Sequence, residues 1–312
     1  MAPPERTRPM TGIALKLCSV TLFITMASLI KATSGHVPAG EAVFFRSFLA
    51  LPVILIWLAL RGDLRTGLKV RSPMNHFWRG FVGTAAMGLG FAALGLLPLP
   101  DVTAIGYAAP LLVVVFAAMF LDERVGMVRI GAVALGLAGV LIVLAPRLTA
   151  LSGPTVQTVE AVGAVLALTG AMCAALAQIY VRKLVQTEET SAIVFFFSIT
   201  AAGLSLLTIP FGWVMPTAPE IGFLMLAGLL GGLGQIFLTS SYRFADASVV
   251  APFDYASILL ALGIGYFVFG EVPTVAMLSG ATLVILAGIL IILRERQLGI
   301  RRNKARSART PE

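Results

Sequence analysis

Long apolar segments separated by short polar connections make up most of this chain. Each apolar segment is close to the roughly 20 residues that a helix needs to cross the hydrocarbon core of a bilayer. The segments that we predict to span the membrane are residues 11–33, 40–60, 77–97, 101–121, 127–146, 161–181, 191–213, 221–242, 247–270 and 274–293. The connections between them are too short for a soluble domain. The pattern predicts an all-α integral membrane protein with ten transmembrane helices.

Composition agrees with this pattern, because 58% of the residues are hydrophobic and only 12% are charged. Soluble chains carry about 25% charged residues, so a soluble enzyme is excluded. A cleaved signal peptide is the alternative for residues 11–33. The segment is long enough to span, and no clear small-x-small cleavage site follows it, so we interpret it as the first helix.

Lysine and arginine predict the orientation of the chain. If the N-terminus is cytoplasmic and ten helices alternate, the external loops receive little beyond Arg147 and Lys31. The basic residues assigned to the cytoplasmic side are Arg6, Arg8, Arg61, Arg65, Lys69, Arg71, Arg79, Arg124, Arg129, Arg182, Lys183, Arg243, Arg294, Arg296, Arg301, Arg302, Lys304, Arg306 and Arg309. This is the positive-inside pattern of a multi-pass protein. We therefore expect a bacterial inner-membrane protein with both termini in the cytoplasm.

The net charge of +8 follows from the same distribution. The positive charge would face the cytoplasm and its anionic lipid surface, so we expect the lipid bilayer as a partner and no nucleic acid. We predict a cytoplasmic N-terminal tail at residues 1–10 and a basic, polar cytoplasmic tail at 294–312, which we expect to be disordered.

Five groups of residues recur in the same order in the two halves of the chain. The matched groups are Gly12 with Gly163, residues 43–47 with 194–198, 88–90 with 232–234, Tyr107 and 120–123 with Tyr255 and 269–271, and 131–139 with 280–288. Each half holds an odd number of helices, so the second half must enter the membrane from the opposite side. The sequence therefore predicts two inverted five-helix repeats, at residues 11–147 and 160–293. Such repeats are typical of secondary transporters, which hold substrate near the midplane of the membrane.

Several of these motifs also carry a family resemblance. They are Phe44-Phe45-Arg46, Phe120-Leu121-Asp122-Glu123-Arg124-Val125, Gly131-Ala132 with Ala138-Gly139-Val140, Gly270-Glu271-Val272, and Gly280-Ala281 with Ala287-Gly288. From about residue 12 to 293 the chain resembles the EamA branch of the drug/metabolite transporter superfamily. Glu41, Arg79-Gly80, Asp101, Thr103-Ala104 and Pro110-Leu111 make the first half similar to a bacterial uptake subgroup. The resemblance implies a ten-helix importer, in a subgroup that includes riboflavin and S-adenosylmethionine importers.

Charged and aromatic side chains at membrane depth are the candidate substrate contacts, because a charge inside a spanning helix is costly and needs a reason. The candidates are Arg46, Tyr107, Asp254, Tyr255, Gln235 and Trp78. The alternatives are ordinary interhelical packing and, for Arg46, a structural pair with Glu41 or with an acid on another helix. Lys16 is interpreted as a lysine that extends to the cytoplasmic interface. Arg46 and Asp254 have Phe197 and Gly106 as their counterparts in the other half, so the symmetry fails there.

A second set of acidic residues is interpreted as structural or gating. Its members are Glu41, Asp101, Glu123, Asp246 and Glu271. Asp101 and Asp246 start helices, where a carboxylate complements the helix dipole. Glu123 and Glu271 end helices on opposite faces of the membrane.

We therefore predict a secondary transporter that moves a small metabolite by alternating access. Riboflavin uptake is the leading hypothesis, because a planar ring would stack on Tyr107, Phe253, Tyr255 and Trp78. S-adenosylmethionine uptake, favoured by the Asp254 charge, and export of amino acids or drugs are the alternatives. A polytopic membrane enzyme is a remote alternative, since it would need converging catalytic groups. We expect no enzyme activity, no cofactor and no metal site; a homodimer is left open.

Overall fold

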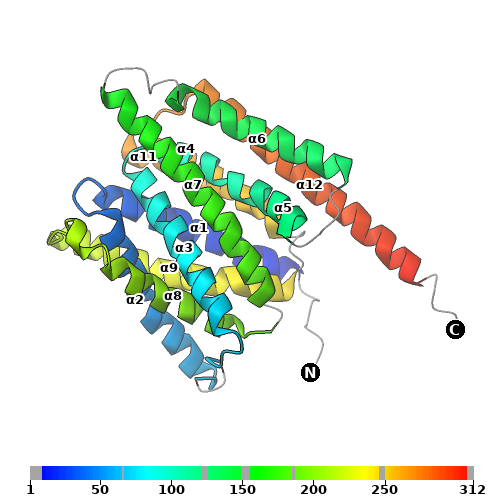
Figure 1. Ribbon diagram of the computed structural model, residues 1–312, viewed down its shortest axis with the longest axis horizontal. Coiled ribbons are helices and arrows are strands. Elements are labelled where there is room, and N and C mark those ends of the chain that lie inside the picture. Colours follow the sequence, from blue (N-terminus) through cyan, green and yellow to red (C-terminus); the bar gives the residue numbers. More distant parts are fainter. Residues whose placement is uncertain are drawn as a thin grey trace.

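The computed structural model describes residues 9–64, 67–120, 126–148, 155–184, 187–245 and 250–307. All regular structure in these ranges is helical (Figure 1). The helices are α1 (Pro9–Thr33), α2 (Ala39–Leu60), α3 (Pro73–Leu94), α4 (Leu99–Gly106), α5 (Ala108–Phe120), α6 (Met127–Leu148), α7 (Thr155–Leu184), α8 (Thr190–Leu206), η2 (Ile209–Phe211), α9 (Ala218–Phe244), η3 (Ala251–Tyr255), α11 (Ala256–Phe269) and α12 (Val275–Ser307).

Every predicted spanning segment has a helical counterpart. Eight segments are long and apolar enough to cross a membrane, and two shorter apolar helices, Thr190–Leu206 and Phe253–Phe269, complete the set of ten. The prediction of an all-α protein with ten apolar helices is confirmed. The expectation of a disordered tail after residue 293 is wrong as far as Ser307, because α12 continues to that residue. This segment is rich in Arg, which is a good helix former.

Two of the ten segments are interrupted. The fourth segment breaks at Tyr107, between α4 and α5, and the ninth begins as the short 3-10 helix η3 before α11. Pro110 has no backbone N–H, and its ring would clash with the carbonyl of Gly106, so the helix breaks just before it. In the ninth segment Pro252 lies in the first turn of η3, where a backbone N–H is not required. The two interrupted segments occupy equivalent places in the two halves, and α4 packs against α11.

The contacts between helices have the two-fold pattern that inverted repeats require. Helix α1 packs against α9, and its counterpart α7 packs against α3; likewise α2 packs against α9, and α8 against α3. Three further pairs join a helix to its own counterpart: α2 to α8, α4 to α11, and α6 to α12. Figure 1 shows α6 and α12 side by side along one edge, away from α2 and α8.

Individual contacts repeat with the same symmetry and give the register of the two halves. A Cβ added at Gly80 on α3 would lie 2.6 Å from Thr200 Cγ2 on α8, and one at Gly228 on α9 would lie 2.5 Å from Leu49 Cβ on α2. The second and seventh segments therefore match with an offset of 151 residues, and the third and eighth with 148.

The match of 88–90 with 232–234 has an offset of 144 and is thus about one helical turn out of register. Glycines recur along both helices, so their pattern does not determine the register.

Two residue pairs mark the symmetry axis. A side chain that contacts its own counterpart must lie close to the axis that relates the repeats. Tyr107 and Tyr255 stack with ring centroids 5.0 Å apart, and the Arg46 guanidinium lies 5.6 Å from the Phe197 ring centroid. In an inverted repeat this axis lies in the membrane plane near its centre. Both pairs are therefore at the depth where such proteins hold substrate.

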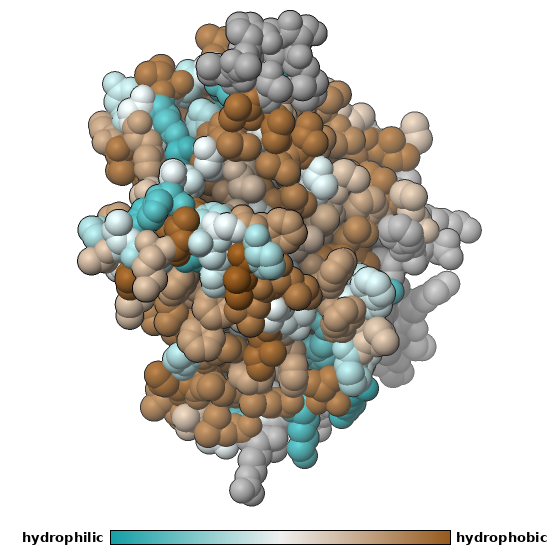
Figure 2. Space-filling view, turned by 60° about the vertical axis from the view of Figure 1, so that its left-hand side comes forward, coloured by the Kyte–Doolittle hydropathy of each residue, from teal (hydrophilic) through white to brown (hydrophobic). Residues whose placement is uncertain are grey.

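The outer surface is apolar, as a lipid-facing surface must be. Figure 2 shows one face covered largely by hydrophobic residues. Large side chains such as Phe211 and Phe267 are each 84% exposed. In water such an exposed apolar surface would promote aggregation. In a bilayer it is in contact with the lipid chains.

The closest backbone approach between α6 and α12 makes a direct test of this packing. A Cβ at Gly139 would lie 2.6 Å from the carbonyl oxygen of Gly280, whereas a Cβ at Gly131, on the same helix, would meet nothing within 4 Å. We expect Gly139→Ala to destabilise the protein by about 1–3 kcal/mol and Gly131→Ala to be neutral or stabilising. Thermal unfolding of the detergent-solubilised variants measures both, and equal melting temperatures would contradict the predicted packing.

Candidate functional site

A buried ion pair joins the first helix to the interrupted ninth segment. The Lys16 ammonium lies 2.7 Å from an Asp254 carboxylate oxygen, with side chains that are 2% and 40% exposed. Lys16 is two turns into α1, where extension to the cytoplasmic interface was expected. That expectation is wrong, because the short 3-10 turn of η3 carries Asp254 against α1 and the lysine pairs inside the bundle. The counterpart of Lys16 in the second half is Ala167 and that of Asp254 in the first half is Gly106, and neither carries a charge.

The two interrupted segments meet directly beside this ion pair. Tyr107 ends α4, and its hydroxyl donates to the Asp254 carbonyl oxygen. The same hydroxyl lies 2.5 Å from Ser257 Oγ in the first turn of α11. The Tyr107 and Tyr255 rings stack on each other at an interplanar angle of 28°. The structure thus brings three sequence candidates, Tyr107, Asp254 and Tyr255, together at the symmetry axis.

Arg46 lies two turns into α2 and is 2% exposed. Its Nε and Nη1 atoms have no hydrogen-bond partner among the described residues. Glu41 is not its partner: Glu41 is itself buried, and its Oε2 accepts a hydrogen bond of 3.1 Å from the backbone N–H of Val214. A guanidinium at membrane depth costs about 2.5–3.5 kcal/mol on insertion scales, so this arrangement needs an explanation.

Arg79 shares this region, which the sequence did not indicate. The pattern of basic residues assigns Arg79 to the cytoplasmic side. This assignment is wrong, because α3 begins at Pro73 and places Arg79 inside the bundle. Its guanidinium carbon lies 3.7 Å from the Phe197 ring centroid. Its Nε and Nη1 atoms are also buried without a partner in the described part of the chain. Because the helix starts four residues earlier than predicted, Arg79 is inside the membrane-spanning segment.

A second polar group lies where α1, the α3–α4 connection and the end of α11 meet. The Lys31 ammonium lies 2.9 Å from Glu271 Oε1 and donates to the carbonyl oxygens of Leu94 and Leu97 at 3.0 and 2.7 Å. Glu271 Oε2 accepts a 2.9 Å hydrogen bond from the N–H of Leu99. Glu271 therefore ties three segments together at one end of the bundle.

Asp101 takes part in another interhelical connection. It lies in the first turn of α4 and is buried. Its Oδ2 accepts hydrogen bonds from Arg147 Nη2 at 2.7 Å and Nε at 3.2 Å. Arg147 Nη1 also donates to Glu160 at the start of the second half. Arg147 thus links Asp101 in the first half to Glu160 in the second, and Asp101 also stabilises the start of α4.

The other candidates are not part of these groups. Gln235 is half-buried on α9, one residue after Gly234. Trp78 is 43% exposed and packs against Phe77 and Phe81 on the outer surface. Glu123 and Asp246 lie outside the described residues.

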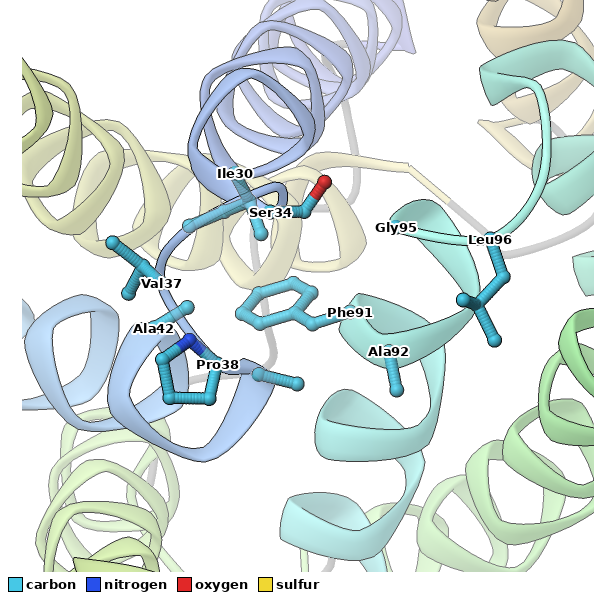
Figure 3. Close-up of a pocket in the computed structure, with 10 residues that line it drawn as sticks. Ile30, Ser34, Val37, Pro38, Ala42, Phe91, Ala92, Gly95 and Leu96 are labelled. Carbon is cyan, nitrogen blue, oxygen red and sulfur yellow. The ribbon is translucent and has the colours of Figure 1, made fainter. Parts of the chain in front are cut away.

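A pocket of about 200 Å³ opens at the same end of the bundle as Lys31. Its wall consists mainly of apolar residues from the end of α1, the start of α2 and the end of α3. In Figure 3 the Phe91 ring lies in the middle of this group, with Ile30 and Ser34 on one side and Pro38 on the other. None of the candidate substrate residues lines this pocket.

Sequence reasoning missed three partners: Lys16, Arg79 and Lys31. Each is a basic residue within two or three turns of a helix end, where a basic side chain is normally assigned to the interface. A signal for Lys16 was present, since its counterpart in the second half is Ala167. Asymmetry between the repeats therefore identifies Lys16 as well as Asp254.

Comparisons with known proteins agree with this architecture. The profile of the EamA-like transporter family matches residues 10–145 and 161–294. A pseudopaline exporter of Pseudomonas aeruginosa is 30% identical over 285 residues, which cover 90% of this chain and 95% of the relative. An S-adenosylmethionine uptake transporter of Rickettsia felis is 26% identical, over 95% of this chain and 97% of the relative.

A riboflavin transporter of Rhizobium johnstonii is 26% identical, over 92% of this chain and 89% of the relative. A solved crystal structure shares the fold, with a TM-score of 0.66 and 21% identity over 93% of this chain and 99% of that one. These relatives are transporters rather than enzymes, and their substrates differ. With both halves matched by the family profile, the chain belongs to the EamA-like transporter family and is a multi-pass bacterial membrane protein, a secondary transporter for a small molecule.

Proposed function

We propose that this transporter moves a small metabolite across the bacterial inner membrane by alternating access, with both termini in the cytoplasm. The observation that carries the mechanism is the contact of the two interrupted segments at Tyr107 and Tyr255. A broken helix exposes backbone groups that can line a cavity. Because each half has an equivalent packing available, exchanging the two packings would open the site first to one side and then to the other.

The Lys31–Glu271 group supports a gating role for Glu271. It holds α1, the α3–α4 connection and the end of α11 together at one end of the bundle. Opening that end would require these interactions to break. Under the proposed orientation this is the external end, and Glu271 would be part of the external gate.

Riboflavin uptake is the first substrate hypothesis that we propose to test. The support for it is the resemblance to a riboflavin transporter and the aromatic residues near the axis. S-adenosylmethionine is the second candidate, supported by the relatives that take it up and by the 40% exposed Asp254 carboxylate beside the axis. Export remains an alternative direction, because one relative is an exporter.

A growth experiment tests the first hypothesis. Expression of this chain is expected to restore growth, at low vitamin supply, of a riboflavin auxotroph that lacks its own importer. A variant with the membrane-exposed change Phe267→Leu serves as an expression-matched control and should also restore growth. Failure of growth despite a normal membrane level would exclude riboflavin uptake. Uptake of radiolabelled S-adenosylmethionine by inverted and right-side-out vesicles then tests the second candidate and the direction.

A further inference from the structure

Two guanidinium groups face one aromatic ring near the symmetry axis. Arg46 on α2 and Arg79 on α3 lie 5.6 and 3.7 Å from the Phe197 ring centroid. Four of their nitrogen atoms, Nε and Nη1 of each residue, are buried and have no hydrogen-bond partner in the part of the chain that the structure describes. No carboxylate among the described residues lies within 4.0 Å of either group.

Two glycines from the helices that cross here leave room for the guanidinium groups. A Cβ added at Gly231 on α9 would lie 2.9 Å from Arg46 Nε, and one at Gly83 on α3 would lie 2.4 Å from Arg79 Nη1. Gly83 and Gly231 are equivalent under the offset of 148 residues. The same repeat position is thus a glycine beside an arginine in both cases, Gly83 beside Arg79 and Gly231 beside Arg46, although both arginines belong to the first half.

The Phe197 ring is not a sufficient partner for two cations. Cation–π contact attracts each guanidinium, but it accepts none of the N–H groups and does not reduce the repulsion between two like charges. By contrast, Lys16, Lys31 and Arg147 each form an ion pair with a carboxylate. Buried donors in folded proteins almost always have a hydrogen-bond partner, so these unpaired N–H groups need an explanation.

We propose that Arg46 and Arg79 form a binding site for a carboxylate group of the transported substrate. Guanidinium N–H groups form short, charge-assisted hydrogen bonds with carboxylate oxygens, and the unpaired Nε–H and Nη1–H groups of the two arginines supply such donors. Phe197 would lie against the apolar part of the same molecule. The proposal rests on the transport function proposed above and specifies the chemical class of its substrate.

This site changes the order of the substrate candidates. S-adenosylmethionine carries a carboxylate, whereas riboflavin carries none. The Asp254 carboxylate is already paired with Lys16, so the uncompensated charge near the axis is positive. The geometry therefore favours a carboxylate-bearing metabolite over a neutral ring system.

The test compares matched ligands on the purified full-length protein in lipid nanodiscs. S-adenosylmethionine is compared with its decarboxylated form, methionine with methioninamide, and riboflavin serves as the neutral compound. The variants are Arg46→Met and Arg79→Met, with Arg147→Met as the matched control, because Arg147 is an arginine with two carboxylate partners. Melting temperature with and without each ligand gives both stability and affinity.

We expect saturable binding of at least one carboxylate compound and no binding of its partner that lacks the carboxylate. Arg46→Met and Arg79→Met should weaken this binding by at least about tenfold while leaving the ligand-free melting temperature equal to or above that of the unmodified protein. Arg147→Met should lower the melting temperature and leave the dissociation constant of the folded protein unchanged. This combination separates a binding role from a structural one, because only a partnerless cation can be removed without loss of stability.

Four outcomes would overturn the proposal: no carboxylate binds, the carboxylate-free partners bind equally well, the arginine variants keep full affinity, or Arg46→Met destabilises the protein as Arg147→Met does. Transport in proteoliposomes distinguishes this failure from failure of the proposed function. Riboflavin transport that is unaffected in both arginine variants would keep the function and reject the site. Arginine-dependent carboxylate binding without any transport would keep the site and reject the function.

Discussion

Replacing both members of the Lys16–Asp254 pair is expected to restore most of the stability that either single replacement removes. Removing one partner of a buried ion pair costs about 3–5 kcal/mol, because the other charge stays in the low-dielectric interior. Because the Asp254 side chain is 40% exposed, we expect a coupling energy below this range, about 2–3 kcal/mol. Thermal unfolding of Lys16→Met, Asp254→Asn and the double variant measures this coupling.

The double variant also separates folding from transport. Asp254→Asn alone would lower uptake either by removing a functional carboxylate or by disturbing α1 and η3. If Asp254 binds substrate or a coupling proton, the double variant will fold normally and still fail to transport. Lys183→Met, an exposed lysine at the end of α7, is the control and should change stability by no more than about 0.5 kcal/mol. Single-variant effects that simply add would show that the two residues do not interact, and normal transport by the double variant would make the pair structural.

Adding one methyl group at Gly288 is expected to disrupt the centre of the molecule. A Cβ at this position on α12 would lie 1.3 Å from the Tyr255 hydroxyl oxygen, so the Tyr255 ring must move. Tyr255 stacks on Tyr107, whose hydroxyl is bonded to the Asp254 backbone and lies against Ser257. Overpacking costs about 1–3 kcal/mol, more than the roughly 1 kcal/mol that alanine gains over glycine in a helix. We expect Gly288→Ala to destabilise the protein by up to about 2 kcal/mol and to lower the transport rate, because the stacked tyrosines are displaced.

Gly263→Ala on α11 is the matched control, because a Cβ there would meet nothing within 4 Å. It should keep full transport and a normal melting temperature. A second variant tests the cause: Tyr255→Leu combined with Gly288→Ala removes the colliding hydroxyl and should recover stability but not transport. Full transport by Gly288→Ala alone would contradict the central role of the stacked tyrosines.

The sequence predicted features that depend on local properties of the chain. Hydropathy was sufficient for the ten segments, because the insertion of a helix depends on the residues of that segment. The inverted repeat also followed from sequence, since an odd number of crossings reverses the second half. Tyr107 and Tyr255 were candidates because they are aromatic side chains at membrane depth. Asp254 was a candidate because it is a charge whose counterpart, Gly106, has none. The structure brings the three residues together.

The partners of these residues required the tertiary structure. Lys16 and Asp254 lie in different halves, and nothing local indicates that η3 carries Asp254 against α1. Arg79 was assigned to the cytoplasm because hydropathy averages over a window, whereas the helix start at Pro73 determines its depth. The register of α3 against α9 likewise came from contacts, since glycines recur along both helices.

The proposed substrate class depends on Arg46 and on the side chains around it. Hydropathy is enough to place the Arg46 charge inside a membrane helix, because insertion into hydrocarbon depends on the residues of that segment. The packing of the helices reveals that Glu41 accepts a hydrogen bond from Val214 and that a second arginine faces the same ring. Whether a buried charge is compensated depends on the side chains of neighbouring helices, and those helices are distant in the chain.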